Sequence, residues 1–483
     1  MALVGGTKKF LDQMLSDTLS LYVAFVAFLA IYAVLQRSSR TLMLVYVTLF
    51  SLAFNYYLNR EMAGLLPLTA FVSWAMTNRM SLCEGALRRR WVWFIVVVQL
   101  MPLVYFKYVG ACVGCIAGIF DSNTSFGQVV LPVGISFYTF QAISHTVDVY
   151  RSRLPQQMDF LEYMFYLSFF PLLLSGPVTR SSHLLPQMRR PLRIDRSMLY
   201  TGLWLVMSGL IKKCVFADYI GQYSVSVFDQ PELYGGFELL MGVMGYSIQI
   251  YCDFSGYSDI AIGVAAMMGF ELRENFKFPY RAVNISEFWR RWHISLSAWF
   301  RDYVYIPLGG SHGGAVRTCL NLMITMLLVG VWHGCSVMFL VWGALHGVGL
   351  ALHRYLRLTI LDRIPNRWYV VVISWIVFQT FMMLTWIVFR SDNVGVAADI
   401  TTRIFTDFDV ESIPAFIRAR GLWVALLAAA FLINGVGGVG YCYLQRLYIR
   451  LPWIVKLLIL ICVVQLVVAF ASAEVKPFIY YRF

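Results

Sequence analysis

The stretch Tyr369-Val-Val-Val-Ile-Ser-Trp-Ile-Val-Phe-Gln-Thr-Phe-Met-Met-Leu-Thr-Trp-Ile-Val-Phe389 contains no charged side chain. A helix needs about 20 apolar residues to cross the hydrocarbon core of a bilayer, so this stretch is long enough to span a membrane. Similar runs occupy Leu19–Leu35, Thr41–Leu58, Trp91–Tyr108, Met338–Leu352, Leu422–Ile433 and Ile454–Ala473. Weaker runs lie at Leu131–Thr146, Tyr163–Pro177, Met198–Leu210, Glu238–Tyr251 and Ile260–Phe270. We therefore predict an all-α polytopic membrane protein with about eleven or twelve membrane segments.

The composition excludes a soluble protein. Hydrophobic residues make up 59% of the 483 residues and charged residues only 13%, which is roughly half the charged share of a soluble domain. No long hydrophilic stretch interrupts the apolar runs, so the chain has no room for a separate soluble catalytic domain. We expect one membrane-embedded domain over residues 1–483. The lack of a fixed-period repeat argues against transporter folds built from duplicated halves.

The positive charge of the chain follows a membrane pattern. The net charge of +13 is concentrated in short connections, including Arg37/Arg40 and Arg88–Arg90. A positive-inside bias places both clusters on the cytoplasmic side, which indicates the lipid bilayer rather than nucleic acid as the partner. The first span would then run inward from a short outer segment, and this start is typical of an uncleaved signal anchor.

Several chemistries lack their sequence motifs. The chain has no GxSxG, Walker or HExxH pattern, so serine hydrolase, P-loop and zincin mechanisms have no support. Its nine cysteines are scattered singly except for Cys112-Val-Gly-Cys115. One such pair without further ligands predicts no metal or redox site.

Residues 126–355 carry nearly all the polar residues at membrane depth, and such residues are functional candidates. Gln141, His145 and Asp148 share one predicted helix face. Arg151 and Arg153 follow at a predicted membrane boundary.

Two carboxylates, Asp253 and Asp259, lie within or beside another predicted span. Paired acids at this depth can serve proton coupling or bind a cation. The interpretation that we favour is structural, with the carboxylates anchoring Arg290, Arg291 or Arg301.

The densest polar segment is Asn284–Tyr303. Read as one interfacial helix, it is capped by Asn284 or Ser286, and Arg290, His293, Ser297 and Arg301 form one stripe. The residue pattern alone supports two interpretations equally: a functional stripe, or a plain amphipathic helix in which His293 is solvated. The following Tyr305–Gly310 segment contains Pro and Gly-Gly and is expected to end the helix.

A second histidine ends a short apolar run. Leu320–Trp332 is too short to cross a bilayer comfortably, so we expect a re-entrant segment that delivers His333 to the membrane interior. Gly334 would allow a helix end or a close approach. An imidazole can take a proton from a hydroxyl and return it to a leaving thiolate. From spacing alone, however, a packed core histidine is the more frequent outcome.

Three motifs together resemble the membrane-bound O-acyltransferase family. They are Phe288-Trp-Arg-Arg-Trp-His-Ile-Ser-Leu-Ser297, Arg301-Asp-Tyr-Val-Tyr-Ile-Pro-Leu-Gly-Gly310 and Val331-Trp-His-Gly334. The segments Leu131–Phe140, Tyr251–Asp259 and Phe478–Phe483 are similar to the alginate-type bacterial branch of that family. These motifs extend from about residue 131 to the C-terminus, whereas the first 125 residues add only hydropathy.

The resemblance implies a fold and a site. It implies a ring of membrane helices, with re-entrant and interfacial helices, around a thin centre pierced by a tunnel. His333 corresponds to the essential histidine of the family and His293 to the second histidine of the bacterial branch. The residues expected to bind substrate or line the tunnel are Arg290, Ser297, Arg301, Asn321, Trp332, Asp253 and Gln141.

The resemblance also implies an activity, the transfer of an acyl group from a cytoplasmic thioester for the modification of a secreted exopolysaccharide such as alginate. The acyl group expected is acetyl. The donor would be acetyl-CoA or another acyl thioester, and no metal or bound cofactor is expected. The implied partners are a periplasmic acetyltransferase of the SGNH-hydrolase type and the polysaccharide synthesis and export machinery. The expected location is the bacterial inner membrane.

Within this reading, His333 acts as general base on the acceptor hydroxyl, while His293 orients the acceptor or stabilises developing charge. Two alternatives stay open. The same fold can support D-alanyl or lipid O-acyl transfer. A transporter would use Asp253, Asp259 and His145 together with the neighbouring arginines.

Overall fold

The computed structural model describes residues 24–110, 131–154, 158–174, 176–190, 194–360, 364–365 and 367–470. Three sequence predictions lie outside these ranges: the outer N-terminal segment, the Cys112–Cys115 pair and the Phe478–Phe483 motif. Every regular element in the described ranges is a helix, which confirms the all-α prediction.

Six helices of the described residues are long and apolar enough to cross a membrane. They are α2 with η1 (Arg40–Met62), α4 with η2 (Gly85–Val109), α15 (Gly314–His333), α16 (Val337–Thr359), α17 (Trp368–Arg390) and α22 (Trp453–Phe470). A seventh span results if α19 (Ser412–Ala419) and α20 (Gly421–Val436), which are bent by 92°, act as one. The chain is therefore a multi-pass membrane protein.

This number, taken over the described residues, is lower than the eleven or twelve segments expected. Several apolar runs form shorter helices that pack inside the protein, and the runs Glu238–Tyr251 and Ile260–Phe270 fall largely within one long helix, α12 (Gly236–Met267). In α6 (Ile135–Tyr150), for example, almost every residue is buried. The further helices are Ala24–Ser38, α3 (Leu65–Ser81), α7 (Phe160–Ser168), α8 (Phe170–Leu173), α9 (Ser181–Arg189), α10 (Arg196–Leu210), η3 (Ile211–Asp218), α11 (Tyr219–Asp229), η4 (Pro231–Leu233), α12 (Gly236–Met267), η5 (Pro279–Arg281), α18 (Val394–Thr406) and α21 (Gly438–Arg450).

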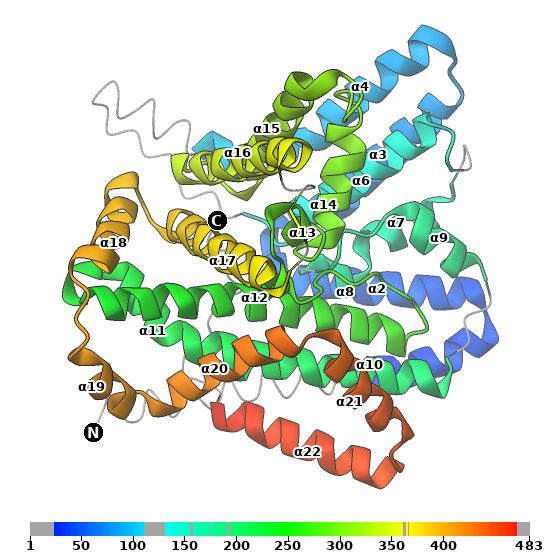
Figure 1. The fold of residues 1–483 in the computed structure, drawn as a ribbon. Coiled ribbons are helices and arrows are strands. Elements are labelled where there is room, and N and C mark those ends of the chain that lie inside the picture. Colours follow the sequence, from blue (N-terminus) through cyan, green and yellow to red (C-terminus); the bar gives the residue numbers. More distant parts are fainter. Residues whose placement is uncertain are drawn as a thin grey trace, which may run out of the picture.

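Glycines allow the central helices to pack closely. A β-carbon at Gly202 of α10 would lie 2.5 Å from the carbonyl oxygen of Gly263 in α12, and Gly209 has the same relation to Gly256. Small residues at such positions let helix backbones approach within a membrane. Figure 1 shows α10, α11 and α12 lying alongside one another, while α15 and α16 lie on the other side of the short helix α13 (Ile285–Trp289).

The prediction of one helix over Asn284–Tyr303 is wrong. The segment contains α13, α14 (Ile294–Phe300) and the π-helix η6 (Arg301–Tyr305). His293 has φ 42°, a left-handed conformation that ends the helical stripe. The cause lies earlier in the chain, because the backbone of Asn275 accepts from Ile294 N–H and Lys277 N–H donates to the Arg291 carbonyl. The predicted cap is confirmed, since the Asn284 side chain accepts from Glu287 N–H.

The helix that carries His333 is longer than the apolar run Leu320–Trp332 suggested. It begins at Gly314, so α15 reaches the length of a membrane span. The helix then turns back into α16, and the two pack closely because a β-carbon at Gly343 would lie 2.5 Å from the Met326 carbonyl oxygen. This hairpin fixes the depth at which the end of α15 lies in the protein.

Candidate active site

His333 is the last residue of α15, and its side chain is 4% exposed. Aromatic rings enclose the imidazole, with centroid separations of 4.8 Å to Trp332 and 5.1 Å to Trp342 and Phe389. The helix ends at Gly334, as predicted, and there a β-carbon would lie 2.5 Å from the ring of Phe339. His333 is thus held in an apolar setting at the end of a rigid helix.

His293 lies between α13 and α14 and is 1% exposed. The interpretation of a solvated surface histidine is therefore wrong. Its Nδ1 is 3.1 Å from the side-chain oxygen of Asn275. That oxygen also accepts from the backbone N–H and the hydroxyl of Ser295, at 3.2 and 2.8 Å.

These contacts determine the tautomer of His293. Because a backbone N–H can only donate, the Asn275 atom facing it must be the amide oxygen, and His293 Nδ1 must carry the proton that faces this oxygen. Burial lowers the pKa of His293 to about 3, so the imidazole is neutral at physiological pH. In the neutral form Nε2 then bears a lone pair and can accept a hydrogen bond. Nε2 has no partner among the described residues.

Trp332 connects the two histidines. Its ring centroid lies 4.8 Å from that of His333 and 6.1 Å from that of His293. Among the described residues, Lys107, His293 and His346 lie close enough to act electrostatically on His333. The two predicted catalytic histidines, far apart in sequence, are therefore brought together around one buried indole.

His346 of α16 is a further buried histidine near this pair, which the sequence reasoning did not single out. It is fully buried, and its ring lies 4.5 Å from that of Trp342, which in turn contacts His333. The apolar run Met338–Leu352 contained it, and nothing in that pattern distinguished it from a packing residue. Its position one helical turn after Trp342 was the available signal.

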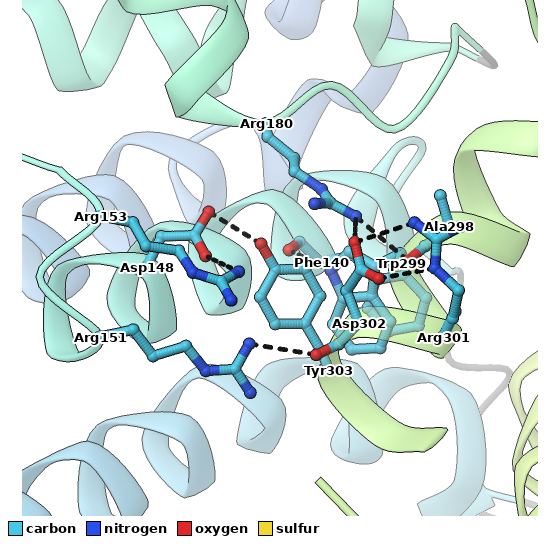
Figure 2. Close-up of polar contacts among 10 residues, drawn as sticks. All are labelled: Phe140, Asp148, Arg151, Arg153, Arg180, Ala298, Trp299, Arg301, Asp302 and Tyr303. Carbon is cyan, nitrogen blue, oxygen red and sulfur yellow. Dashed lines mark hydrogen bonds and ion pairs between the residues drawn. The ribbon is translucent and has the colours of Figure 1, made fainter. Parts of the chain in front are cut away.

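A chain of stacked rings leads from His333 to a charged cluster. Trp332 stacks on Phe140 at 5.7 Å, and Phe140 stacks on Trp299 at 4.0 Å. The indole N–H of Trp299 donates to the Phe140 carbonyl, and the Trp299 ring contacts Tyr303 at 5.2 Å. Tyr303 belongs to the cluster that Figure 2 displays.

We call these four arginines, two aspartates and one tyrosine the arginine cluster; it comprises Asp148, Arg151, Arg153, Arg180, Arg301, Asp302 and Tyr303. In Figure 2 the two carboxylates lie on either side of Tyr303, whose hydroxyl donates to Asp148 at 2.8 Å. Arg180 and Arg301 pair with Asp302 at 2.5 and 2.7 Å. The cluster holds four cations against two anions, and the side chain of Arg301 is 61% exposed.

Four of the other predicted site residues make contacts away from the histidine pair. Arg290 and Ser297 bond to backbone carbonyls of their own segment, those of Ser286 and Trp292. Asn321 lies twelve residues before His333, which is about 18 Å along a helix, and donates to the Gly310 carbonyl. Gln141 is buried on α6 next to Phe140, and its amide faces the Thr179 carbonyl.

The predicted arginine partners of Asp253 and Asp259 are wrong. Asp253 pairs with Lys213 at 2.7 Å, and Asp259 pairs with Lys212 at 2.6 Å. Both lysines belong to the π-helix η3, which the hydropathy pattern did not reveal. Their long stems let the ammonium groups reach α12 from inside an apolar helix.

No three His, Cys, Asp or Glu side chains gather closely enough to hold a metal ion in the part of the chain that the structure describes. The histidine pair, its indole and the arginine cluster form the candidate site that we consider. A family model described as MBOAT, membrane-bound O-acyltransferase family, matches residues 149–391, which contain both histidines.

The chain belongs to the membrane-bound O-acyltransferase family. It is 38% identical over 374 residues to the probable alginate O-acetylase AlgI of Pseudomonas aeruginosa, covering 75% of this chain and 70% of that protein. It is 37% identical over 422 residues to the protein of the same name from Pseudomonas putida, covering 82% and 84%. It is 32% identical over 350 residues to the peptidoglycan O-acetyltransferase of Helicobacter pylori, covering 65% and 64%.

This membrane-bound O-acyltransferase is thus an enzyme rather than the transporter that Asp253 and Asp259 also allowed. The family match covers Trp299 and Trp332 of the aromatic chain as well as the two histidines. Acyl transfer requires a base for a hydroxyl and a setting that excludes water. The imidazole of His333, enclosed by aromatic rings, offers a base of this kind in such a setting.

Proposed function

We propose that this enzyme transfers an acetyl group from acetyl-CoA, or a similar cytoplasmic thioester, for the O-acetylation of a secreted polysaccharide of the alginate type. The proposal places the protein in the bacterial inner membrane, with a periplasmic SGNH-type acetyltransferase as its partner. The observation that carries it is the pair of buried histidines around Trp332. The similarity to alginate O-acetylases supports the choice of acyl group and acceptor.

In the proposed reaction His333 is the general base. Its imidazole takes the proton of the acceptor hydroxyl, and the hydroxyl oxygen attacks the thioester carbonyl carbon. The tetrahedral intermediate collapses as the C–S bond breaks, and the imidazolium returns the proton to the leaving thiolate. The products are an ester and a free thiol, so atoms and charges balance without a covalent acyl-enzyme.

The resemblance left two roles open for His293, orienting the acceptor or stabilising developing charge, and we propose only the first. A neutral imidazole with its proton on Nδ1 cannot donate from Nε2 to an oxyanion. It can instead accept a hydrogen bond, and we assign His293 to orienting the acceptor hydroxyl towards His333. Holding the reacting groups in line in this way can supply several kcal/mol of the rate enhancement.

The arginine cluster supports a phosphate-bearing donor. It holds an excess of positive charge, and its Tyr303 begins the chain of rings that ends at His333. Guanidinium groups pair well with phosphate. We propose that the phosphates of the donor bind at this cluster while the acyl thioester extends through a tunnel along the rings to the histidine pair.

Purified enzyme in nanodiscs should test the donor and the acceptor separately. Radiolabelled acetyl-CoA is offered with soluble alginate oligosaccharides and the periplasmic partner, and the transferred label is counted. Label in the oligosaccharide, lost when any one component is omitted, supports the proposal. Label transfer only from a D-alanyl carrier protein, or only to peptidoglycan fragments, would overturn it and identify the competing activity.

A further inference from the structure

The C-terminal end of α15 is held by a span from the opposite end of the chain. The last four carbonyls of a helix have no partner inside the helix. Two of these carbonyls in α15 are bonded by η2: Lys107 Nζ donates to the Trp332 carbonyl at 2.5 Å, and the Tyr108 hydroxyl donates to the Val331 carbonyl at 2.6 Å. The residue after Trp332 is His333.

Charge adds to these hydrogen bonds. The C-terminus of a helix carries a partial negative charge, which an ammonium group stabilises, most strongly where water is scarce. The Lys107 ammonium also lies 5.7 Å from the centre of the Trp332 ring, within range of a cation–π contact. Lys107 therefore binds both the backbone and the side chain of the residue that separates the two histidines.

Lys107 and Tyr108 both lie in η2, a short π-helix. Residues Tyr105–Val109 form a π-helix at the end of α4, and such turns widen a helix and frequently occur at functional sites. Lys107 and Tyr108 are consecutive, and so are their acceptors, the carbonyls of Trp332 and Val331. Here both reach the same helix end.

We propose that Lys107 and Tyr108 are positioning residues for acyl transfer, which fix the end of α15 and so hold His333 in line with the reacting groups. The proposal rests on the function proposed above. The proposal assigns a functional role to two of the first 110 residues, a region in which the sequence indicated only membrane spans. Neither residue needs to contact the substrate, because both act through the backbone of Val331 and Trp332.

The chain offers a matched control in Lys456 of α22. Its ammonium group bonds the Ile449 carbonyl in the last turn of α21 at 2.9 Å and lies over the Tyr200 ring. Lys456→Met therefore removes the same kind of helix cap, in a helix that carries no site residue. Lys107→Met, Lys107→Arg and Tyr108→Phe are compared with it and with the wild type, all in nanodiscs.

The first measurement is hydrogen exchange of peptides that cover the last turns of α15 and α21. Lys107→Met should raise exchange at residues 329–335 about tenfold and leave α21 unchanged, whereas Lys456→Met should do the reverse. Unchanged exchange at residues 329–335 in Lys107→Met would overturn the cap. This measurement requires no substrate, so it remains decisive even if wild-type enzyme transfers no acetyl group and the proposed function fails.

The second measurement separates turnover from donor binding. Lys107→Met should lower kcat for acetyl transfer about 10- to 100-fold, as expected for a small misplacement of a catalytic group, while binding of a non-hydrolysable acetyl-CoA thioether changes less than about twofold. Lys107→Arg keeps a cationic donor and should restore most of the turnover, and Tyr108→Phe should show a smaller loss. Normal turnover in Lys107→Met, or an equal loss in Lys456→Met, would overturn the positioning role.

Discussion

The side-chain oxygen of Asn275 lies 3.1 Å from Nδ1 of His293 and so fixes which ring nitrogen carries the proton. The two residues belong to different segments, and Asn275 is itself held by a hydrogen bond from its amide nitrogen to Ser258 of α12. The neutral histidine is thereby oriented with a free lone pair on Nε2. The proposed role of His293 depends on this single amide.

Replacing Asn275 should therefore impair both stability and activity. Asn275→Ala leaves His293 Nδ1 and the two donors of Ser295 without their acceptor, and unpaired buried groups cost about 1–3 kcal/mol each. Acetyl transfer should fall about tenfold or more. Asn434→Ala is the control, because Asn434 is also buried but bonds only within its own helix. Equal activity in the two variants would contradict the orientation of His293 by Asn275.

Gly334 should not tolerate even one additional carbon atom. In Gly334→Ala the β-carbon would meet the Phe339 ring at 2.5 Å, and overpacking of this kind typically costs about 1–3 kcal/mol. Because Phe339 packs beside His333, the shift should reduce acetyl transfer as well as thermal stability. Gly435→Ala, in α20 with open space around it, should be neutral or slightly stabilising. A fully active Gly334→Ala enzyme would show that the end of α15 is not tightly packed.

The arginine cluster should affect donor affinity more than turnover. Arg301→Gln removes an exposed cation without breaking the pair between Arg180 and Asp302. We expect the KM for acetyl-CoA to rise about 5- to 10-fold, with kcat nearly unchanged, because the binding loss is the same in ground and transition states. Arg418→Gln, an exposed arginine of α19, should leave both constants unchanged. A fall in kcat at constant KM would place Arg301 in the chemistry instead.

Acid should destabilise the enzyme well above the pKa of its carboxylates. Burial lowers the pKa of His145 and of His293 to about 3, whereas an exposed histidine titrates near 6.5. The unfolded chain then binds more protons between pH 6.5 and 3, so stability falls as pH falls through this window, by about 1.4 kcal/mol per pH unit for each group. The loss of stability is measured as the fall in the thermal unfolding midpoint, in nanodiscs, between pH 7.5, 6.0 and 5.0. The pH dependence should be weaker in His145→Gln, and a midpoint independent of pH would contradict buried neutral histidines.

Hydropathy predicted the helical membrane fold because the length of an apolar run such as Tyr369–Phe389 shows directly that a helix can span the membrane. It could not predict how each run folds internally. The break at Arg290–His293 is set by Asn275, which belongs to a separate segment, and local periodicity favours an unbroken helix there. The π-helix η3 likewise follows from packing against α12, so its lysines could not be assigned to Asp253 and Asp259.

The site was predictable where short motifs carried it. Two motifs, Val331-Trp-His-Gly334 and Phe288–Ser297, identified His333 and His293 as candidate site residues. The structure brings both histidines together around Trp332. Residues that act from isolated positions were missed. Lys107 reads as a basic residue near the end of a span, and Asn275 reads as part of a polar loop, because their significance lies in contacts with distant segments.

The central claim is that His333 is the general base of acyl transfer. The most direct measurement is the rate of acetyl transfer by His333→Ala enzyme in nanodiscs. The rate is expressed per amount of folded protein, and the variant must unfold at the wild-type temperature for the comparison to count. His312→Ala, an exposed histidine in the turn before α15, serves as the matched control. We predict that His333→Ala lowers kcat by at least about 100-fold while His312→Ala retains full activity. A correctly folded His333→Ala enzyme with near wild-type acetyl transfer would contradict the account.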